Sequence, residues 1–392
     1  MEANHNVIFI FARIFRNSHR RIFQLDELMN LGYNIKLLDL CPINNCSATI
    51  TDPFLFNLTI KINNYKELDL FKKGLSEEPI IYVTNDGNLR NYKLLFKNIK
   101  RKQDKLLSFN TRVFPGLYNE RTGFKKLIHN AVIHLDGVLP FYKLKLLWEF
   151  VYSSYLPDYY LASTDFIVPT KITLSLPKEK RFIVHSDDVN QLIIESKPKL
   201  FPNKRIGIFI DQLIPMAKKH QLDESYRRDY YTRLEKCLIA LKVKFGLDDV
   251  IVASHPEASC YAEELKNELP NLKKVSNQTH SLIKEAKVVF THYSTSVGVA
   301  VYYDKPVVLL VDDILLSDKA VKRCIIEYVR ALDLLVYNMD NSLEGIEISK
   351  IHINKYLYNE YKKKYLMGNN IKENSYLYSI SEISDAIRRK VV

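Results

Sequence analysis

The sequence predicts an α/β protein with two parallel-sheet domains, and three observations support this prediction. Short apolar runs alternate with helical patterns from residue 7 onward, which is the order of β-α-β units. The alternation begins again after a Pro- and Lys-rich stretch at residues 197–204. The chain has 392 residues, which is too long for one ordinary core and favours two domains.

The composition is that of a globular protein with a basic surface. Hydrophobic residues make up 47% of the chain and charged residues 26%, and no apolar run approaches the length of about 18 residues that a membrane span needs. The formal net charge of +12 would suit nucleic acid, an anionic membrane surface or a phosphorylated substrate. No arginine-rich arm or RNA-binding signature is present, so we predict no nucleic-acid partner. The densest basic run, Lys97–Lys102, fits either a solvated helix face or a contact with anionic lipid or a lipid-linked substrate.

The N-terminus and the cysteines favour a cytoplasmic protein. The first apolar run precedes the first basic residues, which is the reverse of a secretory signal. The five cysteines form no CxxC pair, and reduced thiols are the simplest account of them. Cys41 and Cys46 have no partner pair at zinc-site spacing, and we predict no metal ion and no other cofactor.

The first half of the chain begins with a β-α-β unit. Val7–Ala12 predicts a strand, the helical pattern from Ser18 stops at Gly32, and Asn34–Leu40 predicts a second strand. Further strands are predicted at Leu58–Ile62, Pro79–Val83, Tyr159–Ala162 and Asp165–Val168, and further helices at Tyr65–Lys73 and from Asn85 or Asn88 to about Lys102. This alternation is Rossmann-like, but the GxGxxG fingerprint of a tightly bound dinucleotide is absent.

Two segments in the middle of the first half each allow two interpretations. A strand candidate at Ala131–Ile133 leads into Asp136 and Gly137, a pair that is typical of a turn. Alternatively, Asp136 projects from a strand end into a cleft between the domains and acts as a general base. The segment Leu144–Tyr155 is apolar around most of its circumference, which fits a buried helix or a contact with a membrane surface.

The second half repeats the alternation from Arg205. A strand that ends at Asp211 leads through a loop to a long helix from about Ser225 to Phe245. Strands are then predicted at Val250–Ala253, Leu272–Val275, Val288–Phe290 and Lys305–Val311, with helices near Cys260–Leu269, Ser281–Glu285, Ser317–Leu332, Asn354–Leu366 and Ser381–Arg389. We therefore expect an N-terminal domain at residues 1–196, a linker at 197–204, a second domain at 205–350, and C-terminal helices at 351–392 that pack back on the N-terminal domain.

Two predicted strands of the second half end in clusters of polar residues. His255 and Pro256 follow the strand at Val250–Ala253, and residues 291–296 (Thr-His-Tyr-Ser-Thr-Ser) follow the strand at Val288–Phe290. Parallel α/β sheets bind ligands at the carboxyl ends of their strands, and a helix that begins after the second cluster could hold a phosphate. The alternatives are a structural role for His255 and a helix cap at Ser294–Ser296. The pairs Asp187-Asp188 and Asp312-Asp313 could likewise cap helices.

The order of these motifs resembles that of bacterial surface-polysaccharide glycosyltransferases of GT-B type, which build capsules and O-antigens and include sialyltransferase-like and Kdo-transferase-like groups. The motifs that carry the resemblance are Asp136-Gly137, His255-Pro256 and Ser294-Thr295-Ser296. The sialyltransferase-like enzymes have two acidic residues before the glycine, and Leu135 occupies the first of those places here. The resemblance is strongest over Ile206–Val311. It implies two Rossmann-like domains whose parallel sheets face each other across a cleft, with C-terminal helices that fold back.

The resemblance also implies a function and roles for individual residues. The reaction would be a metal-independent, inverting transfer of a sugar from a nucleotide-sugar to a cell-surface or lipid-linked glycan at the inner face of the membrane. A CMP-linked nonulosonic acid or Kdo is one candidate donor. Asp136 would be the catalytic base and His255 would contact the donor phosphate or ribose. The implied donor-binding residues are Asp211, Gln212, His255, Pro256, Glu257, His292, Ser294, Thr295 and Ser296.

Two other functions remain open from the sequence. One is a polyol-phosphate transferase of teichoic-acid type, which also uses two domains and a phosphate site. The other is a non-catalytic nucleotide-sugar-binding protein that serves in assembly.

Overall fold

The computed structural model describes two compact units of the chain. Its described residues are 5–11, 17–42, 52–85, 100–111, 156–164, 168, 172, 175–194, 200–216, 224–256, 258–341, 351–368 and 374–391. The first unit extends to Ile194 and takes in the chain again from Met367, and the second unit ends at Leu366. The predicted boundary near residue 196 lies next to the first of these positions.

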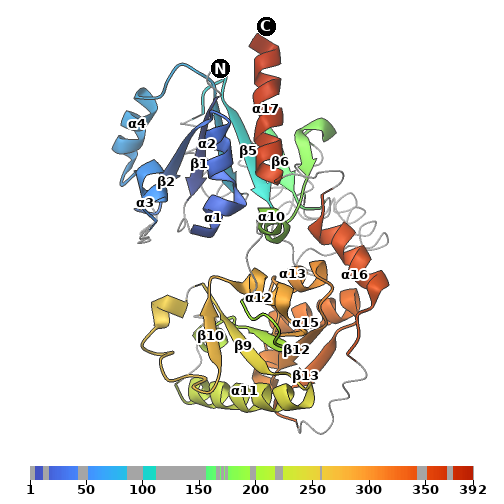
Figure 1. The fold of residues 1–392 in the computed structure, drawn as a ribbon. Helices are drawn as coiled ribbons and strands as arrows, with labels where there is room; N and C mark the ends of the chain where they lie inside the picture. Colours follow the sequence, from blue (N-terminus) through green and yellow to red (C-terminus); the bar gives the residue numbers. More distant parts are fainter. Residues whose placement is uncertain are drawn as a thin grey trace, which may run out of the picture. The chain divides into compact units, whose positions relative to one another are not determined.

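The first unit is built on a parallel sheet of seven strands among the described residues, in the order β3-β2-β1-β4-β5-β6-β7 (Figure 1). The side chains of β1 alternate between its two faces: Val7 and Phe9 enter one core cluster, and Ile8 and Ile10 enter the other. Both faces are therefore covered, as parallel sheets require. The elements of this unit are β1 (Asn6–Phe11), α1 (Asn17–Ile22), α2 (Leu25–Asn30), β2 (Asn34–Asp39), α3 (Pro53–Leu58), β3 (Thr59–Lys61), α4 (Tyr65–Lys73), β4 (Ile80–Asn85), β5 (Lys105–Asn110), β6 (Tyr159–Ala162), β7 (Arg181–Ile183), α10 (Asp187–Ile194) and α17 (Ser375–Val391).

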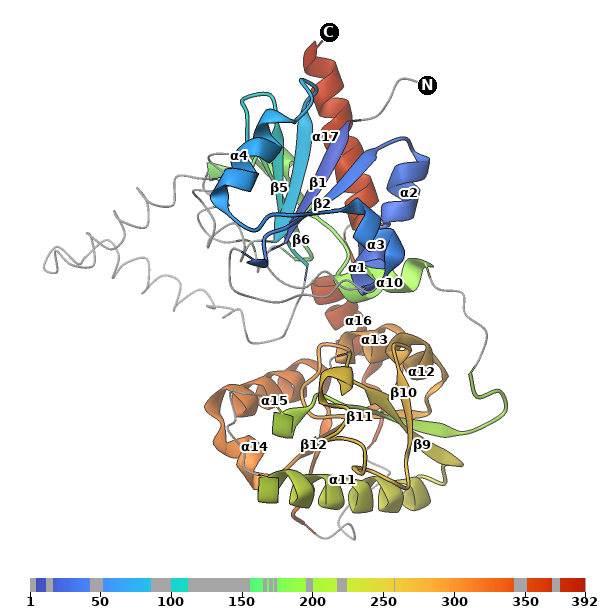
Figure 2. The ribbon, with the colours of Figure 1, turned by 90° about the vertical axis from the view of Figure 1, so that its left-hand side faces the viewer.

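The last helix, α17, completes the core of the first unit. Tyr376, Ile380, Ile383 and Ile387 have helical spacing and belong to the same buried cluster as Val7. The ring of Tyr376 packs edge-on against those of Phe23 and Phe109, with centroids 4.5 and 5.3 Å apart. In both views α17 lies along the first sheet, although it is far from β1 in sequence (Figures 1 and 2).

The second unit has a parallel sheet of six strands among the described residues, in the order β10-β9-β8-β11-β12-β13. Helix α11 covers one face of this sheet, and α12 and α13 cover the other (Figure 2). The elements are β8 (Ile206–Ile210), α11 (Glu224–Lys244), β9 (Asp249–Ser254), β10 (Lys273–Ser276), α12 (Thr279–Glu285), β11 (Val288–Thr291), α13 (Val297–Tyr302), β12 (Val307–Val311), α14 (Asp313–Ser317), α15 (Lys319–Leu332), β13 (Leu335–Asn338) and α16 (Lys355–Tyr361). Two parallel sheets with helices confirm the predicted fold class.

The C-terminal segment is divided between the two units. Helix α16 and the π-helical turn Lys362–Leu366 belong to the second unit, where Tyr358 donates a hydrogen bond to the Lys305 carbonyl (3.0 Å) and Lys362 pairs with Asp304 (2.7 Å). Of the predicted segment 351–392, α17 is the helix that packs on the first unit.

The predicted helix near Cys260–Leu269 is wrong. The chain there forms a short 3-10 turn, Ala258–Tyr261, followed by irregular turns. The ammonium group of Lys274 donates to the carbonyls of Leu265 (3.2 Å) and Glu268. Leu269 adopts a left-handed conformation with φ of 51°, and Pro270 follows it. The left-handed residue before the proline therefore lies where the predicted helix would end, and no regular helix precedes it in the described segment from Ala258.

Candidate functional site

The second sheet has a crossing point between β8 and β11. The chain adds β9 and β10 on one side of β8, then returns to add β11, β12 and β13 on the other side. The connections after β8 and β11 therefore leave in opposite directions, and α/β sheets of this kind bind ligands in the crevice where they part. The residues that follow β8, β9 and β11 form the candidate donor site.

Asp211 follows β8 and ties the connections after β8 and β9 together. Its side chain is buried, and its Oδ1 accepts a hydrogen bond from the backbone N–H of Leu213 (2.9 Å). Burial raises the pKa of Asp211, and the backbone N–H groups of Leu213, Gln212 and His255 oppose that rise. The N–H of Asp211 also donates to the carbonyl of Ala253 in β9 (3.1 Å), so this residue joins the ends of the two neighbouring strands.

Gln212 links the two sides of the crossing point. Its Oε1 accepts a hydrogen bond from the backbone N–H of Tyr293 (2.8 Å) and a longer one from the hydroxyl of Thr291 (3.4 Å). The residue after β8 therefore supports the turn after β11. This arrangement was not part of the sequence prediction, which assigned Gln212 to the donor.

His255 and Pro256 lie in the connection after β9. His255 is partly exposed, and its carbonyl accepts from the N–H of Ala258 (2.9 Å) to close a turn at the exposed Pro256. Part of the surface of His255 is therefore open to solvent next to the crossing point. Glu257 and Asp136 lie outside the described residues.

The residues after β11 form a tight turn that leads into α13. Ser294 is buried, and its Oγ accepts from the N–H of Ser296 (3.2 Å), while its carbonyl accepts from the hydroxyl of Tyr328 on α15 (2.8 Å). Ser296 is at the N-cap position of α13, but its side chain makes no capping hydrogen bond. Thr295 is exposed. The turn therefore presents Thr295 outward, and Ser294 supports the backbone.

His292 has both ring nitrogens engaged within the protein. Nδ1 lies 2.6 Å from the Leu310 carbonyl, and Nε2 lies 2.6 Å from the Tyr230 hydroxyl. A carbonyl oxygen can only accept, so Nδ1 carries the proton and Nε2 accepts from Tyr230. The side chain is fully buried, and burial lowers the pKa of His292, which keeps the ring neutral. A direct contact of this ring with a donor would require breaking one of these hydrogen bonds.

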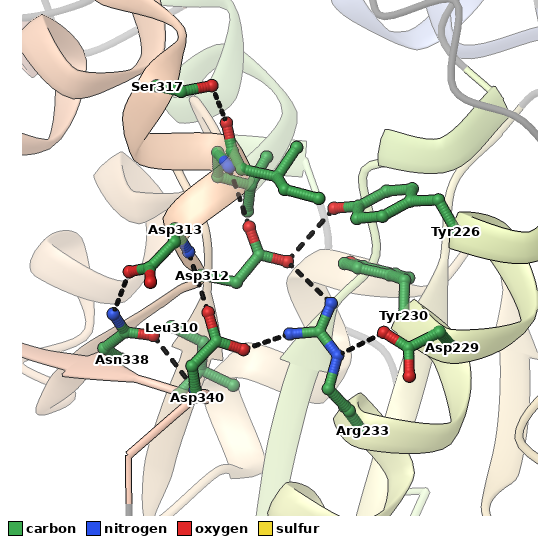
Figure 3. A network of polar contacts seen from close by, with 12 residues as sticks. Tyr226, Asp229, Tyr230, Arg233, Leu310, Asp312, Asp313, Ser317, Asn338 and Asp340 are labelled. Atoms are coloured by element: carbon green, nitrogen blue, oxygen red, sulfur yellow. Dashed lines mark hydrogen bonds and ion pairs between the residues drawn. The ribbon is translucent and has the colours of Figure 1, made fainter.

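Asp312 follows β12 and is the centre of a polar network (Figure 3). Its Oδ1 accepts from the N–H of Leu315 (2.7 Å) and caps α14, which confirms the capping role predicted for this aspartate pair. Its Oδ2 accepts from the Tyr226 hydroxyl (3.0 Å) and from Arg233 (3.4 Å). Arg233 also pairs with Asp229 (2.7 Å) and with Asp340.

The tyrosines and the arginine of this network were not predicted from the sequence. Tyr226, Tyr230 and Arg233 lie on one face of α11 at spacings of four and three residues. That spacing is a signal visible in the sequence, but it does not say which strand ends the helix face contacts.

Comparisons with known proteins show the fold. No protein-family model and no curated protein matches the sequence. A structure of a histidine variant of the wall teichoic acid polymerase TagF aligns with a TM-score of 0.55 at 13% identity, over 99% of this chain and 89% of that chain. A second TagF variant gives 0.53 at 16% identity, and a TagF structure soaked with CDPG for 15 minutes gives 0.53 at 14% identity, both over 99% of this chain and 89% of that chain.

The structural alignments and the two parallel sheets define the fold class of this protein, which is the two-domain α/β fold of GT-B type. At this level of identity the likeness establishes the fold alone. In the part of the chain that the structure describes, no helix combines the length and the apolar character needed to cross a bilayer.

Proposed function

We propose that the protein is a glycosyltransferase that moves a sugar from a nucleotide-sugar donor to a cell-surface glycan. The observation that supports this most is the gathering of polar groups from three connections, those after β8, β9 and β11, around the crossing point of the second sheet. His255 and Thr295 both have exposed surface there. The GT-B fold makes a nucleotide-sugar the natural class of donor.

In the proposed reaction, an acceptor hydroxyl attacks the anomeric carbon of the donor and the bond from that carbon to the phosphate oxygen breaks. The electron pair leaves with the nucleotide, so negative charge increases on its phosphate. Thr295 and Ser296 hydroxyls and the His255 side chain would donate hydrogen bonds to that charge, which stabilises it without a metal ion. The acceptor proton passes to a carboxylate, for which Asp136 is our candidate.

We expect nucleotide-linked donors to raise the melting temperature of the second unit. At a donor concentration about 100 times Kd, binding adds about 2.7 kcal/mol, which corresponds to about 5–10 °C for a unit of this size. A panel of CMP-, UDP-, GDP- and CDP-linked donors is measured by differential scanning calorimetry, with and without EDTA. His255→Ala should lose most of the shift, because it removes a side chain next to the crossing point.

The matched control is His352→Ala, because His352 is exposed and lies before α16 in the same unit. It should keep the full shift. If no donor stabilises the parent protein, the donor site is wrong, and a shift that disappears with EDTA would contradict metal independence.

Asp136→Asn should abolish transfer and leave donor binding unchanged. An amide cannot take the acceptor proton, so kcat should fall by a factor of about 100 or more. The variant is compared with Asp69→Asn on the exposed surface of α4, which should transfer at the parent rate. Full activity of Asp136→Asn would remove this residue as the base.

The second candidate is a polyol-phosphate transferase of teichoic-acid type, which the likeness to TagF favours. The two reactions leave different products on the acceptor, since polyol-phosphate transfer adds phosphorus and sugar transfer does not. Mass spectrometry of the acceptor after turnover therefore separates them. Donor binding without turnover of any donor would support the non-catalytic alternative.

We also propose that the acceptor is lipid-linked and that the protein works at the inner face of the membrane, where the net charge of +12 would favour anionic lipid.

A further inference from the structure

One face of α11 is bonded to the ends of strands on the far side of the crossing point. The Tyr226 hydroxyl donates to Asp312 after β12, and Arg233 pairs with Asp312 (Figure 3). The Tyr230 hydroxyl contacts His292 after β11. Tyr230 is fully buried, as is His292. Helix α11 therefore covers the sheet and also contacts the candidate site, because Tyr230 is hydrogen-bonded to His292 after β11.

His292 is a rigid link between three elements. Its ring joins the end of β11 to the carbonyl of Leu310 in β12 through Nδ1 and to α11 through Nε2. Because both hydrogen bonds are 2.6 Å long and buried, the ring has one tautomer and one orientation. Tyr293, the first residue of the turn after β11, follows His292 directly in the chain.

The turn that follows is supported at several of its polar groups. Gln212 accepts from the N–H of Tyr293, and Ser294 accepts from the N–H of Ser296 and, through its carbonyl, from Tyr328. Supports thus come from the connection after β8, from α15 and, through His292, from α11. A turn held from three sides keeps its hydroxyl groups in place before any ligand arrives.

We propose that Tyr230 and His292 are positioning residues for the turn Tyr293–Ser296. Tyr230 holds the ring, the ring holds the start of the turn, and the turn holds Thr295 and Ser296 where the donor phosphate would bind. His292 does not itself touch the donor. This inference has two halves. The mechanical half is that Tyr230 and His292 hold the turn in place, and it concerns the turn alone. The functional half is that the turn so held binds the donor phosphate, and it rests on the proposed function.

The helix offers a matched pair of substitutions to test this. Tyr230→Phe removes the hydroxyl that His292 accepts from, whereas Tyr231→Phe removes a neighbouring hydroxyl that is buried without a hydrogen-bond partner. Loss of the first leaves a buried acceptor unsatisfied, and loss of the second leaves nothing unsatisfied. Hydrogen exchange measured by mass spectrometry on the full chain should show faster exchange of the amides from Tyr293 to Gly298, by about tenfold, in Tyr230→Phe but not in Tyr231→Phe.

The second measurement is the affinity for CMP, CDP, UDP and GDP by calorimetry, well below the melting temperature of each variant. For each nucleotide that the parent protein binds, Kd should rise about tenfold in Tyr230→Phe and stay unchanged in Tyr231→Phe. His292→Asn, which retains an N–H near the Leu310 carbonyl but cannot reach Tyr230, should behave as Tyr230→Phe does. If the Tyr230 hydroxyl had a structural role alone, Tyr230→Phe would lower the melting temperature and leave Kd unchanged.

The outcomes separate the two claims. Equal exchange of the turn in Tyr230→Phe and Tyr231→Phe overturns the mechanical half, and faster exchange with an unchanged Kd overturns the functional half. If the parent protein binds none of the four nucleotides, the donor site of the proposed function fails together with the functional half. The exchange comparison then still decides whether Tyr230 and His292 hold the turn.

Discussion

Asp312→Ala should lower the free energy of unfolding of the second unit by about 2–4 kcal/mol. Asp312 is fully buried, and its two carboxylate oxygens serve different partners, the N–H of Leu315 and the Tyr226 hydroxyl. Alanine removes the N-cap of α14, which costs about 1 kcal/mol, and leaves the partly buried Tyr226 hydroxyl without its acceptor, which costs about 1–3 kcal/mol. Urea unfolding followed by circular dichroism, with calorimetry to separate the two units, measures the loss.

The neighbouring aspartate provides the control for this substitution. Asp313 is exposed and accepts one hydrogen bond from Asn338 (2.8 Å), so Asp313→Ala should cost less than about 1 kcal/mol. Asp312→Asn retains one oxygen for capping and should fall between the two. Equal effects of Asp312→Ala and Asp313→Ala would show that the network in Figure 3 contributes little to stability.

Gly368→Ala should destabilise the first unit by about 2–3 kcal/mol. Gly368 lies where the chain re-enters this unit, and its N–H donates to Nδ1 of His185 (3.0 Å). A Cβ at this position would lie 2.5 Å from Cα and 2.6 Å from the carbonyl carbon of Val184, and backbone atoms cannot move aside as a flexible side chain can. The chain before α17 would shift, so hydrogen exchange over Ser375–Val391 should also become faster.

Gly74→Ala is the matched control in the same unit. The Cβ at Gly74 would meet only two carbonyl oxygens, at 3.6 and 3.7 Å, which is ordinary contact. Its φ of −86° is accessible to alanine, so stability should stay within about 1 kcal/mol of the parent. If Gly368→Ala proves as harmless as Gly74→Ala, the close approach to Val184 does not constrain the return of the chain.

The strands with strong apolar runs were predicted correctly. β1, β8, β11 and β12 are buried on both faces, and such strands read as continuous apolar sequence. β5 (Lys105–Asn110), β7 (Arg181–Ile183) and β13 (Leu335–Asn338) were missed. β5 mixes polar and apolar residues after a basic run, and β13 is an edge strand of only four residues, too short to carry a pattern.

The candidate site was predictable in part, because polar residues after parallel strands collect at one edge of the sheet. The positions of His255 and Thr295 follow from that rule. The partners of Gln212 and His292 do not, since a hydrogen bond between side chains depends on where other elements lie. His292 was predicted to bind the donor, whereas both of its ring nitrogens are hydrogen-bonded within the protein.

The sequence by itself determined the parallel α/β class, the second run of β-α-β units from Arg205, and the polar residues at the ends of β8, β9 and β11. These follow from local periodicity and from the geometry of parallel strands. Only the tertiary structure decided that α17 completes the first unit while α16 packs on the second, that Tyr230 bonds the ring of His292, and that Asp312 caps α14 and bonds Tyr226. The reason is physical, because these contacts join residues far apart in the chain and no local pattern specifies which distant partner satisfies a buried polar group.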